Sequence, residues 1–396
     1  GSVRAPRVYG RRLFGGTGDA GKRYVSVPEE RLEELVRAEV AYLASVPVKP
    51  LTLRQVLEWR DPVEVADYIL KEGPKRLALR IRLLESLTAW HEVPELVQTH
   101  AKLNRWYRSF LLARGGSENM RDLVTRIVDI REDGREVVPL VAAGIHKLHR
   151  ISPAYDTKFL DKWLDGFLLS RIGTNVLADH FVSITKFSDG GLARETGIVD
   201  SKCDATAACR RAAKVAAELC LKHTGLEPSY TVENYIAGEL GPQPNSPCYF
   251  SYIPSYLLYI VLELLKNSFN ATAKIAASQA DVQKRPVQIL VCRDERRVAI
   301  MVSDRAGGIP SDAGDRIWSY LYGAVARPAG TNDDAPPATQ LAGYGVGLPI
   351  SRLYARYLGG DLDVTSYPGY GTQAHVTLPR LDVALVEKVP TDDWLK

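Results

Sequence analysis

The sequence lacks several features that define other classes of protein. Its 396 residues include only five cysteines, an odd number without a C-x-x-C pair, so neither a disulfide framework nor a zinc site is indicated. Apolar stretches such as 256–265 are too short to span a bilayer. The net charge of +4 is small, which gives no argument for nucleic acid as a partner. We therefore expect a soluble globular protein of a reducing compartment, without a transmembrane segment.

The N-terminal stretch is basic and rich in small residues. Residues 1–23 contain six arginines and lysines against one acid, Asp19. This composition resembles the remnant of a mitochondrial transit region, and it equally fits a plain basic tail, with Gly1-Ser2 as a cloning scar. We assign residues 1–27 to a basic N-terminal tail, either a transit remnant or a tag.

Residues 28–188 have a helical pattern throughout. Apolar residues recur every three or four positions, as at Leu32 and Val36, and no strand pattern interrupts them. Asp61-Pro62 has the form of a helix start, and Gly73-Pro74 is expected to end that helix. The long periodic segments are residues 75–91, 94–113, 137–149 and 156–186. Their number and length predict an all-α four-helix bundle with smaller accessory helices.

The pattern changes after a linker assigned to residues 189–202. Strands then alternate with helices, which predicts an α+β sandwich over residues 203–382, with helices on one face of a mixed sheet. The strand candidates are residues 230–235, 249–253, 287–293, 297–303, 361–366 and 372–378, and the helices begin near 204 and span 255–274 and 348–358. Residues 383–396 form a C-terminal tail.

Glu263 and Asn267 lie four residues apart in a strongly helical stretch, which places both on one face of the helix. A hard cation prefers oxygen ligands, so the amide oxygen of Asn267 can hold Mg²⁺ against phosphate oxygens. Glu263 can then act as a base toward an attacking hydroxyl. The same spacing also occurs in a plain polar stripe on an amphipathic helix, so the pentapeptide alone does not distinguish a catalytic site from such a stripe.

Asp304 follows a strand pattern directly and precedes two glycines, ending in Gly308. A carboxylate at this place suits a purine whose exocyclic amine donates to it, because glycines permit a close approach of the backbone. Thr372 begins the last strand, and its hydroxyl can complete the same site. Without the other motifs, Asp304 to Gly308 would be only a turn.

Glycines at 343, 345 and 347 open a helix that has Pro349 in its first turn. The free amides and the positive end of this helix can receive phosphates. A dinucleotide fold would need these glycines directly after a strand, whereas a loop precedes them here. That loop, residues 322–342, is rich in Gly, Pro, Ala and Asp and predicts either a lid over a nucleotide or a plain surface loop.

In this order the motifs are those of the ATPase superfamily shared by histidine kinases, heat-shock chaperones, mismatch-repair ATPases and type II topoisomerases. The residues within these motifs most closely resemble those of the mitochondrial pyruvate and branched-chain ketoacid dehydrogenase kinases. The segments 137–139, 159–162 and 169–172 resemble the helical domain of that family. The resemblance covers most of the chain from about residue 50.

The resemblance implies a serine kinase that uses ATP and Mg²⁺, with K⁺ near the lid. Glu263 would be the general base and Asn267 the Mg²⁺ ligand. The residues implied for nucleotide binding are Asn267, Asn270, Asp304, Gly308, Gly323, Ala324, Gly343, Tyr344, Gly345, Val346, Gly347, Leu348 and Thr372.

The resemblance also implies partners and a compartment. The substrate would be the α subunit of the decarboxylase of a 2-oxoacid dehydrogenase complex, which the phosphorylation inactivates in the mitochondrial matrix. The kinase would be a homodimer that docks on a lipoyl domain of the acyltransferase core. Asp393-Trp394 resembles an element of the pyruvate branch, which favours pyruvate dehydrogenase as the target; branched-chain dehydrogenase is the alternative.

Four positions depart from the family. Tyr259 stands where a histidine is usual, four residues before the glutamate, and 134–136 lack a loop histidine. Asn270 replaces an arginine, and Ala306 replaces the first glycine after the aspartate. These changes leave open a catalytically weakened module that binds ATP for regulation.

A two-component histidine kinase is a less favoured alternative. It would need a phospho-accepting histidine followed by an acid on an exposed helix, and His91-Glu92 is the one such pair. Pro94 follows almost directly, which places His91 at a helix end.

Overall fold

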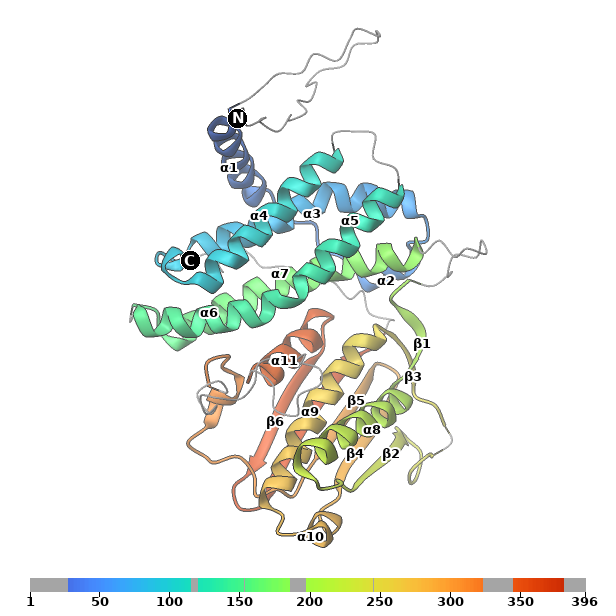
Figure 1. Cartoon of the computed structure of the whole chain (residues 1–396). Coiled ribbons are helices and arrows are strands. Elements are labelled where there is room, and N and C mark those ends of the chain that lie inside the picture. Colours follow the sequence, from blue (N-terminus) through green and yellow to red (C-terminus); the bar gives the residue numbers. More distant parts are fainter. Residues whose placement is uncertain are drawn as a thin grey trace.

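The computed structural model describes residues 28–114, 120–152, 154–185, 197–244, 246–322 and 345–380. A helical half is followed along the chain by a half built around a β-sheet (Figure 1). The expected N-terminal tail, nearly all of the expected lid and the C-terminal tail with Asp393-Trp394 lie outside the described residues.

The helical half consists of long helices that pack along one another. Helix α3 contacts α4 and α7, and α6 contacts the same two helices, so the four enclose a shared apolar interior. Leu83, Tyr107, Ile145 and Phe167 are fully buried there, one from each of the four helices. In the described part of the chain, no helix is both long and apolar enough to cross a bilayer. The helices are α1 (Glu29–Ser45), α2 (Leu53–Glu58), α3 (Pro62–Glu85), η1 (Trp90–Glu92), α4 (Pro94–Arg114), α5 (Met120–Asp133), η2 (Gly134–Glu136), α6 (Val137–Ile151) and α7 (Thr157–Ile184).

The prediction that Gly73-Pro74 ends a helix is wrong, because α3 runs through both residues. A proline inside a helix costs about 3 kcal/mol. The apolar face of α3 continues beyond it with Leu77 and Ile81, and burying each such side chain returns about 1.5–3 kcal/mol. Gly73 leaves room for the ring of Phe110, which would lie 3.3 Å from a Cβ at that position. Tertiary packing therefore outweighs the local signal.

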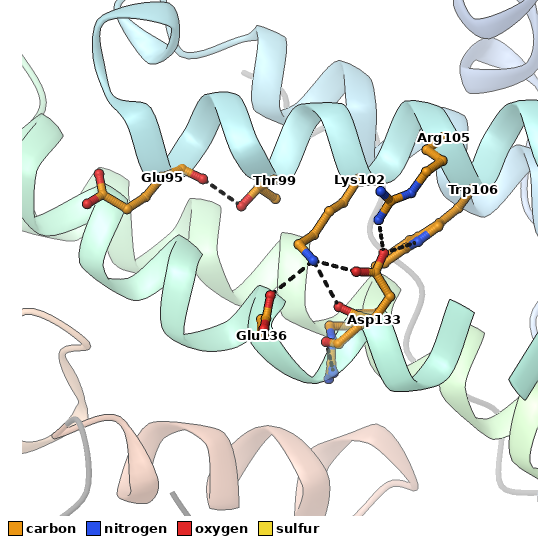
Figure 2. Close-up of polar contacts among 9 residues, drawn as sticks. Glu95, Thr99, Lys102, Arg105, Trp106, Asp133 and Glu136 are labelled. Carbon is orange, nitrogen blue, oxygen red and sulfur yellow. Dashed lines mark hydrogen bonds and ion pairs between the residues drawn. The ribbon is translucent and has the colours of Figure 1, made fainter. Parts of the chain in front are cut away.

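A cluster of polar side chains holds the junction between α5 and α6 (Figure 2). Trp106 Nε1 donates to Asp133 Oδ2 at 2.7 Å, and the α4 cations Lys102 and Arg105 pair with the same carboxylate. Lys102 also pairs with Glu136 on η2 at 3.1 Å. Because one carboxylate accepts from three α4 side chains, the cluster ties the α5–α6 junction to α4.

The second half contains a five-stranded mixed sheet with the order β2-β4-β5-β7-β6. Only β2 and β4 are parallel, and the other neighbours are antiparallel. Strand β1 pairs with β3 in a separate two-stranded sheet, and it begins at Asp200, within the expected linker. The elements are β1 (Asp200–Asp204), α8 (Ala205–Thr224), β2 (Tyr230–Ile236), β3 (Tyr249–Tyr252), α9 (Pro254–Ile275), α10 (Gln279–Gln283), β4 (Val287–Arg293), β5 (Arg297–Ser303), η3 (Gly314–Trp318), α11 (Gly347–Tyr357), β6 (Asp361–Tyr367) and β7 (Gly371–Pro379).

Helices α8, α9 and α11 cover one face of this sheet (Figure 1). Side chains alternate along a strand, so Val298, Ile300 and Val302 of β5 are buried on the helix-covered face while Ala299 points away. Helix α8 starts where Asp204 accepts hydrogen bonds from the first turn. The predicted α+β layering of this half is confirmed.

The two halves meet where α7 touches the residues just before the expected lid. Asp161 Oδ1 accepts from the hydroxyl of Ser319 and from the main-chain N–H of Tyr320, both at 3.0 Å. The Tyr320 hydroxyl donates to Asp165 Oδ1 at 2.7 Å. His146 Nε2 lies 3.3 Å from the carbonyl oxygen of Tyr320. Tyr320 is buried, so this contact belongs to the packed interior.

Candidate functional site

Helix α9 carries the first set of predicted site residues. Its inner face is apolar, with Leu257, Ile260 and Leu264 buried, because these residues recur at helical spacing. Glu263 and Asn267 lie one turn apart on another face, where Glu263 is half-buried and Asn267 is exposed. The helix therefore presents an acid and an amide side by side at its surface. Asn270 follows one turn later on the same face, half-buried.

Glu263 is held between two neighbours. Lys266 Nζ donates to Glu263 Oε1 at 2.8 Å, and the lysine is only 2% exposed. On the other side, a Cβ added to Gly347 would stand 2.3 Å from Glu263 Oε2. A Cβ at this position would push the carboxylate aside, so the glycine lets the start of α11 contact Glu263 as it stands.

The start of α11 is the predicted phosphate-binding end. Gly345 has a positive φ of 77°, which favours glycine, and Val346 precedes the first helical residue, Gly347. Leu348 follows in the first turn, where main-chain N–H groups have no partner within the helix. Such a helix end attracts anions. It faces the Glu263 carboxylate of α9.

Asp304 follows β5 and is 5% exposed. Its Oδ2 accepts from the hydroxyl of Ser268 at 2.9 Å, and its Oδ1 accepts from the main-chain N–H groups of Ala306 and Thr372 at 3.0 and 3.3 Å. Burial raises the pKa of the Asp304 carboxyl, while these three hydrogen bonds oppose that rise. The carboxylate is thus fixed in orientation by two strands and α9.

Glycines bring the strand ends close around Asp304. Gly308 has a φ of 74°, and a Cβ there would lie 2.4 Å from the carbonyl oxygen of Tyr367. Ser366 Oγ accepts from the N–H of Ile309 at 2.7 Å and lies 3.3 Å from the Thr372 hydroxyl. The structure therefore gathers Asp304, Gly308 and Thr372 in one place, as the sequence predicts.

Both parts of the site rest on α9. Ser268, which binds Asp304, comes five residues after Glu263, a rise of about 7.5 Å along the helix. Asn267 lies between these two positions in the sequence. Four predicted residues, Gly323, Ala324, Gly343 and Tyr344, lie outside the described residues.

Sequence reasoning missed two residues of this site, Lys266 and Ser268. Both lie next to Asn267, and both are buried polar residues of α9. The available signal was their position: Ser268 lies four residues after Leu264 and Lys266 lies three residues before Phe269, so each stands at helical spacing from a buried apolar residue. A polar residue at such a position needs a partner. In the described part of the chain, no group of three or more His, Cys, Asp or Glu side chains could hold a metal ion.

A layered α+β half with these residues on α9, β5, β7 and the start of α11 defines a class of ATPases. The family model described as "Histidine kinase-, DNA gyrase B-, and HSP90-like ATPase" matches residues 253–382, which include all of these elements. A second family model, "Mitochondrial branched-chain alpha-ketoacid dehydrogenase kinase", matches residues 50–200 of the helical half.

Comparison with curated proteins identifies the family within this class. The chain is 31% identical to pyruvate dehydrogenase (acetyl-transferring) kinase isozyme 4, mitochondrial, of Ictidomys tridecemlineatus, over 90% of this chain and 87% of that protein. It is 30% identical to the Homo sapiens isozyme 4 with the same coverage, and 30% identical to the Arabidopsis thaliana kinase over 84% and 90%. The chain belongs to the family of mitochondrial dehydrogenase kinases.

Proposed function

We propose that this protein is an ATP-dependent serine kinase that phosphorylates and inactivates the α subunit of the decarboxylase of the mitochondrial pyruvate dehydrogenase complex. One observation carries this proposal. The chain aligns over 90% of its length with a protein named as a pyruvate dehydrogenase kinase, so both halves are matched together. Branched-chain dehydrogenase is the alternative target, since the helical half matches the model named for that kinase.

The surroundings of Asp304 fit the purine of ATP. A carboxylate has about four lone-pair sites, and the hydrogen bonds from Ser268, Ala306 and Thr372 use three of them. One acceptor site remains for the exocyclic amine of adenine. Gly308 lets the backbone of Tyr367 come close beside this group.

The region between α9 and α11 fits the phosphates and the chemistry of transfer. The N-terminal amides of α11 at Gly347 and Leu348 bind phosphate oxygens, and Glu263 takes the proton of the attacking serine hydroxyl. Asn267 would hold Mg²⁺ together with the phosphates, and the ion would neutralise part of their charge. K⁺ near the lid is part of the proposal, and the lid itself lies outside the described residues.

The proposal includes a homodimer, a lipoyl domain as docking partner and the mitochondrial matrix as the compartment. The sheet face opposite α8, α9 and α11 supports the dimer, because Leu290 of β4 and Met301 of β5 are register partners on that face and only half-buried. The proposal also describes the helical half as a four-helix bundle of α3, α4, α6 and α7.

The departures from the family have different structural consequences. Ala306 donates its main-chain N–H to Asp304, and alanine and glycine supply this donor equally well. Ala306 also needs no glycine-like backbone, because no non-glycine residue of the described chain has a positive φ. This departure is therefore compatible with nucleotide binding. Tyr259 packs its ring 5.1 Å from that of Tyr354, and burial raises the pKa of Tyr259 well above its usual value. Unlike the histidine that is usual at this position, the phenol beside Glu263 cannot take up a proton near neutral pH. This difference favours the weakened regulatory module as the second candidate function.

The test is transfer of labelled γ-phosphate from Mg²⁺-ATP to purified pyruvate and branched-chain dehydrogenase complexes, side by side. Serine labelling of one α subunit, slowed by about a hundredfold or more in Glu263→Gln and strongly reduced in Asp304→Ala, is the expected result and names the substrate. Glu218→Gln, an exposed position on α8, is the matched control and should keep full activity. ATP binding without transfer to either complex would contradict the kinase function and favour the regulatory module.

A further inference from the structure

Lys266 is a buried lysine at the centre of the candidate site. Lysines are almost never fully buried unless they are paired, and its side chain is only 3% exposed. Its ammonium donates to Glu263 Oε1 at 2.8 Å, and the Glu263 side chain is 14% exposed. In the described part of the chain, no other cation lies within ion-pair distance of Glu263.

The fold does not require this pair. Lys266 is buried on α9, and its neighbours three and four positions away along the helix include the apolar residues Phe269 and Leu262. Replacing a buried ion pair with apolar residues of similar volume is often neutral or stabilising, because burying two charges is costly. A methionine has a similar volume and would fill the space of Lys266 among these apolar neighbours. The charge at this position therefore needs another explanation.

The geometry around Glu263 gives one. Its two carboxylate oxygens have different neighbours, since Oε1 accepts from Lys266 and Oε2 is directed toward Gly347 at the start of α11. A carboxylate without the ammonium could rotate about its terminal torsion, which is broad for glutamate. The hydrogen bond from Lys266 fixes this torsion and keeps Oε2 toward the phosphate-binding end of α11.

We infer that Lys266 is a positioning residue for phosphoryl transfer: it holds the Glu263 carboxylate so that Oε2 meets the hydroxyl of the substrate serine. This inference rests on the proposed kinase function. Lys266 touches neither nucleotide nor substrate and acts through Glu263 alone. The reaction itself is unchanged, with the serine proton passing to Glu263 and the γ-phosphoryl group passing to the serine oxygen.

Removal of a positioning contact changes the rate and leaves nucleotide affinity intact. A misplacement of about 1 Å costs up to about a hundredfold in rate. Lys266→Met should therefore lower kcat by about tenfold to a hundredfold. The KM for ATP should stay within about twofold, because Asp304 and the amides of α11 are not altered.

The experiment measures serine labelling of the dehydrogenase complex by the wild type, Lys266→Met, Glu263→Gln and the double variant. Lys274→Met, an exposed lysine on the same helix, is the matched control and should behave as the wild type. Because Lys266 acts through Glu263, Lys266→Met should have no further effect in the Glu263→Gln background. ATP affinity and thermal unfolding of each variant report whether the fold and the pocket are intact.

The outcomes separate the two proposals. If the wild type labels neither complex, the kinase function is wrong, and so is the role of Lys266 that depends on it. If the wild type labels a complex and Lys266→Met labels it within twofold as fast, only the positioning role is overturned. A raised KM for ATP at unchanged kcat, or a further loss in the double variant, would also overturn it, since Lys266 would then act on the nucleotide or independently of Glu263.

Discussion

Replacing Asp165 with asparagine should make the protein more stable at neutral pH. Asp165 lies on α7 at the contact between the two halves, where burial raises the pKa of its carboxyl from 3.8 to about 6. The nearby charge of Asp161 adds to this rise, and the hydrogen bond from Tyr320 opposes it. Asparagine keeps an oxygen that can accept from the Tyr320 hydroxyl, so the substitution removes the buried charge without removing the contact.

The magnitude follows from the difference between the folded and unfolded pKa values. The raised value means that the folded state binds the proton more tightly, so this group's contribution to stability falls as pH rises from about 4 to above 6. The full penalty at pH 7.5 is about 3 kcal/mol, and at pH 5 it is about half as large. Asp165→Asn should therefore increase the free energy of unfolding by up to about 3 kcal/mol at pH 7.5 and by less at pH 5.

The assay is urea unfolding of the wild type and the variant at pH 7.5 and pH 5. Asp315→Asn, an exposed carboxylate on η3, is the control and should change the free energy of unfolding by less than about 0.5 kcal/mol at both pH values. A variant that is destabilised, or stabilised equally at both pH values, would refute the reasoning. Such a result would mean that another interaction offsets the cost of burying the Asp165 charge.

Three further substitutions test the candidate site and the contact between the two halves. Ser268→Ala removes a hydrogen bond to the Asp304 carboxylate and should weaken ATP binding about tenfold in calorimetry, with little change in kcat. Gly308→Ala should destabilise the fold by about 2 kcal/mol or more in urea unfolding, whereas Gly369→Ala, also at positive φ but in open space, should cost only about 1–2 kcal/mol. Tyr320→Phe should cost about 1–3 kcal/mol at pH 7.5 in the same assay, because it leaves a buried carboxylate with one donor fewer.

The candidate site could be predicted from the sequence because its residues fall in short motifs. The strand contexts of Asp304 and Thr372 predict that the two residues share one site, and the structure joins them by hydrogen bonds. Glu263 and Gly347 were predicted for neighbouring roles, and the structure brings them into contact. Their catalytic and binding roles stay predictions.

Other features could not be predicted, for physical reasons. The passage of α3 through Pro74 depends on packing by residues distant in sequence, whose total outweighs a local preference. The contact between Asp165 and Tyr320 joins residues 155 positions apart, and neither lies in a pattern that indicates the other. The pairing of Lys266 with Glu263 has helical spacing, yet the sequence alone does not show that the lysine is buried.

Helix α9 sets the length of the site. It supports the proposed purine ligand Asp304 through Ser268 and carries the proposed base, Glu263, and both belong to one continuous, packed helix. The separation between these two points therefore does not depend on how the helical half sits on the sheet half. A relative movement of the two halves would change access to the site. It would leave the distance along α9 between Ser268 and Glu263 unchanged, so the site would accept the same length of nucleotide in either arrangement.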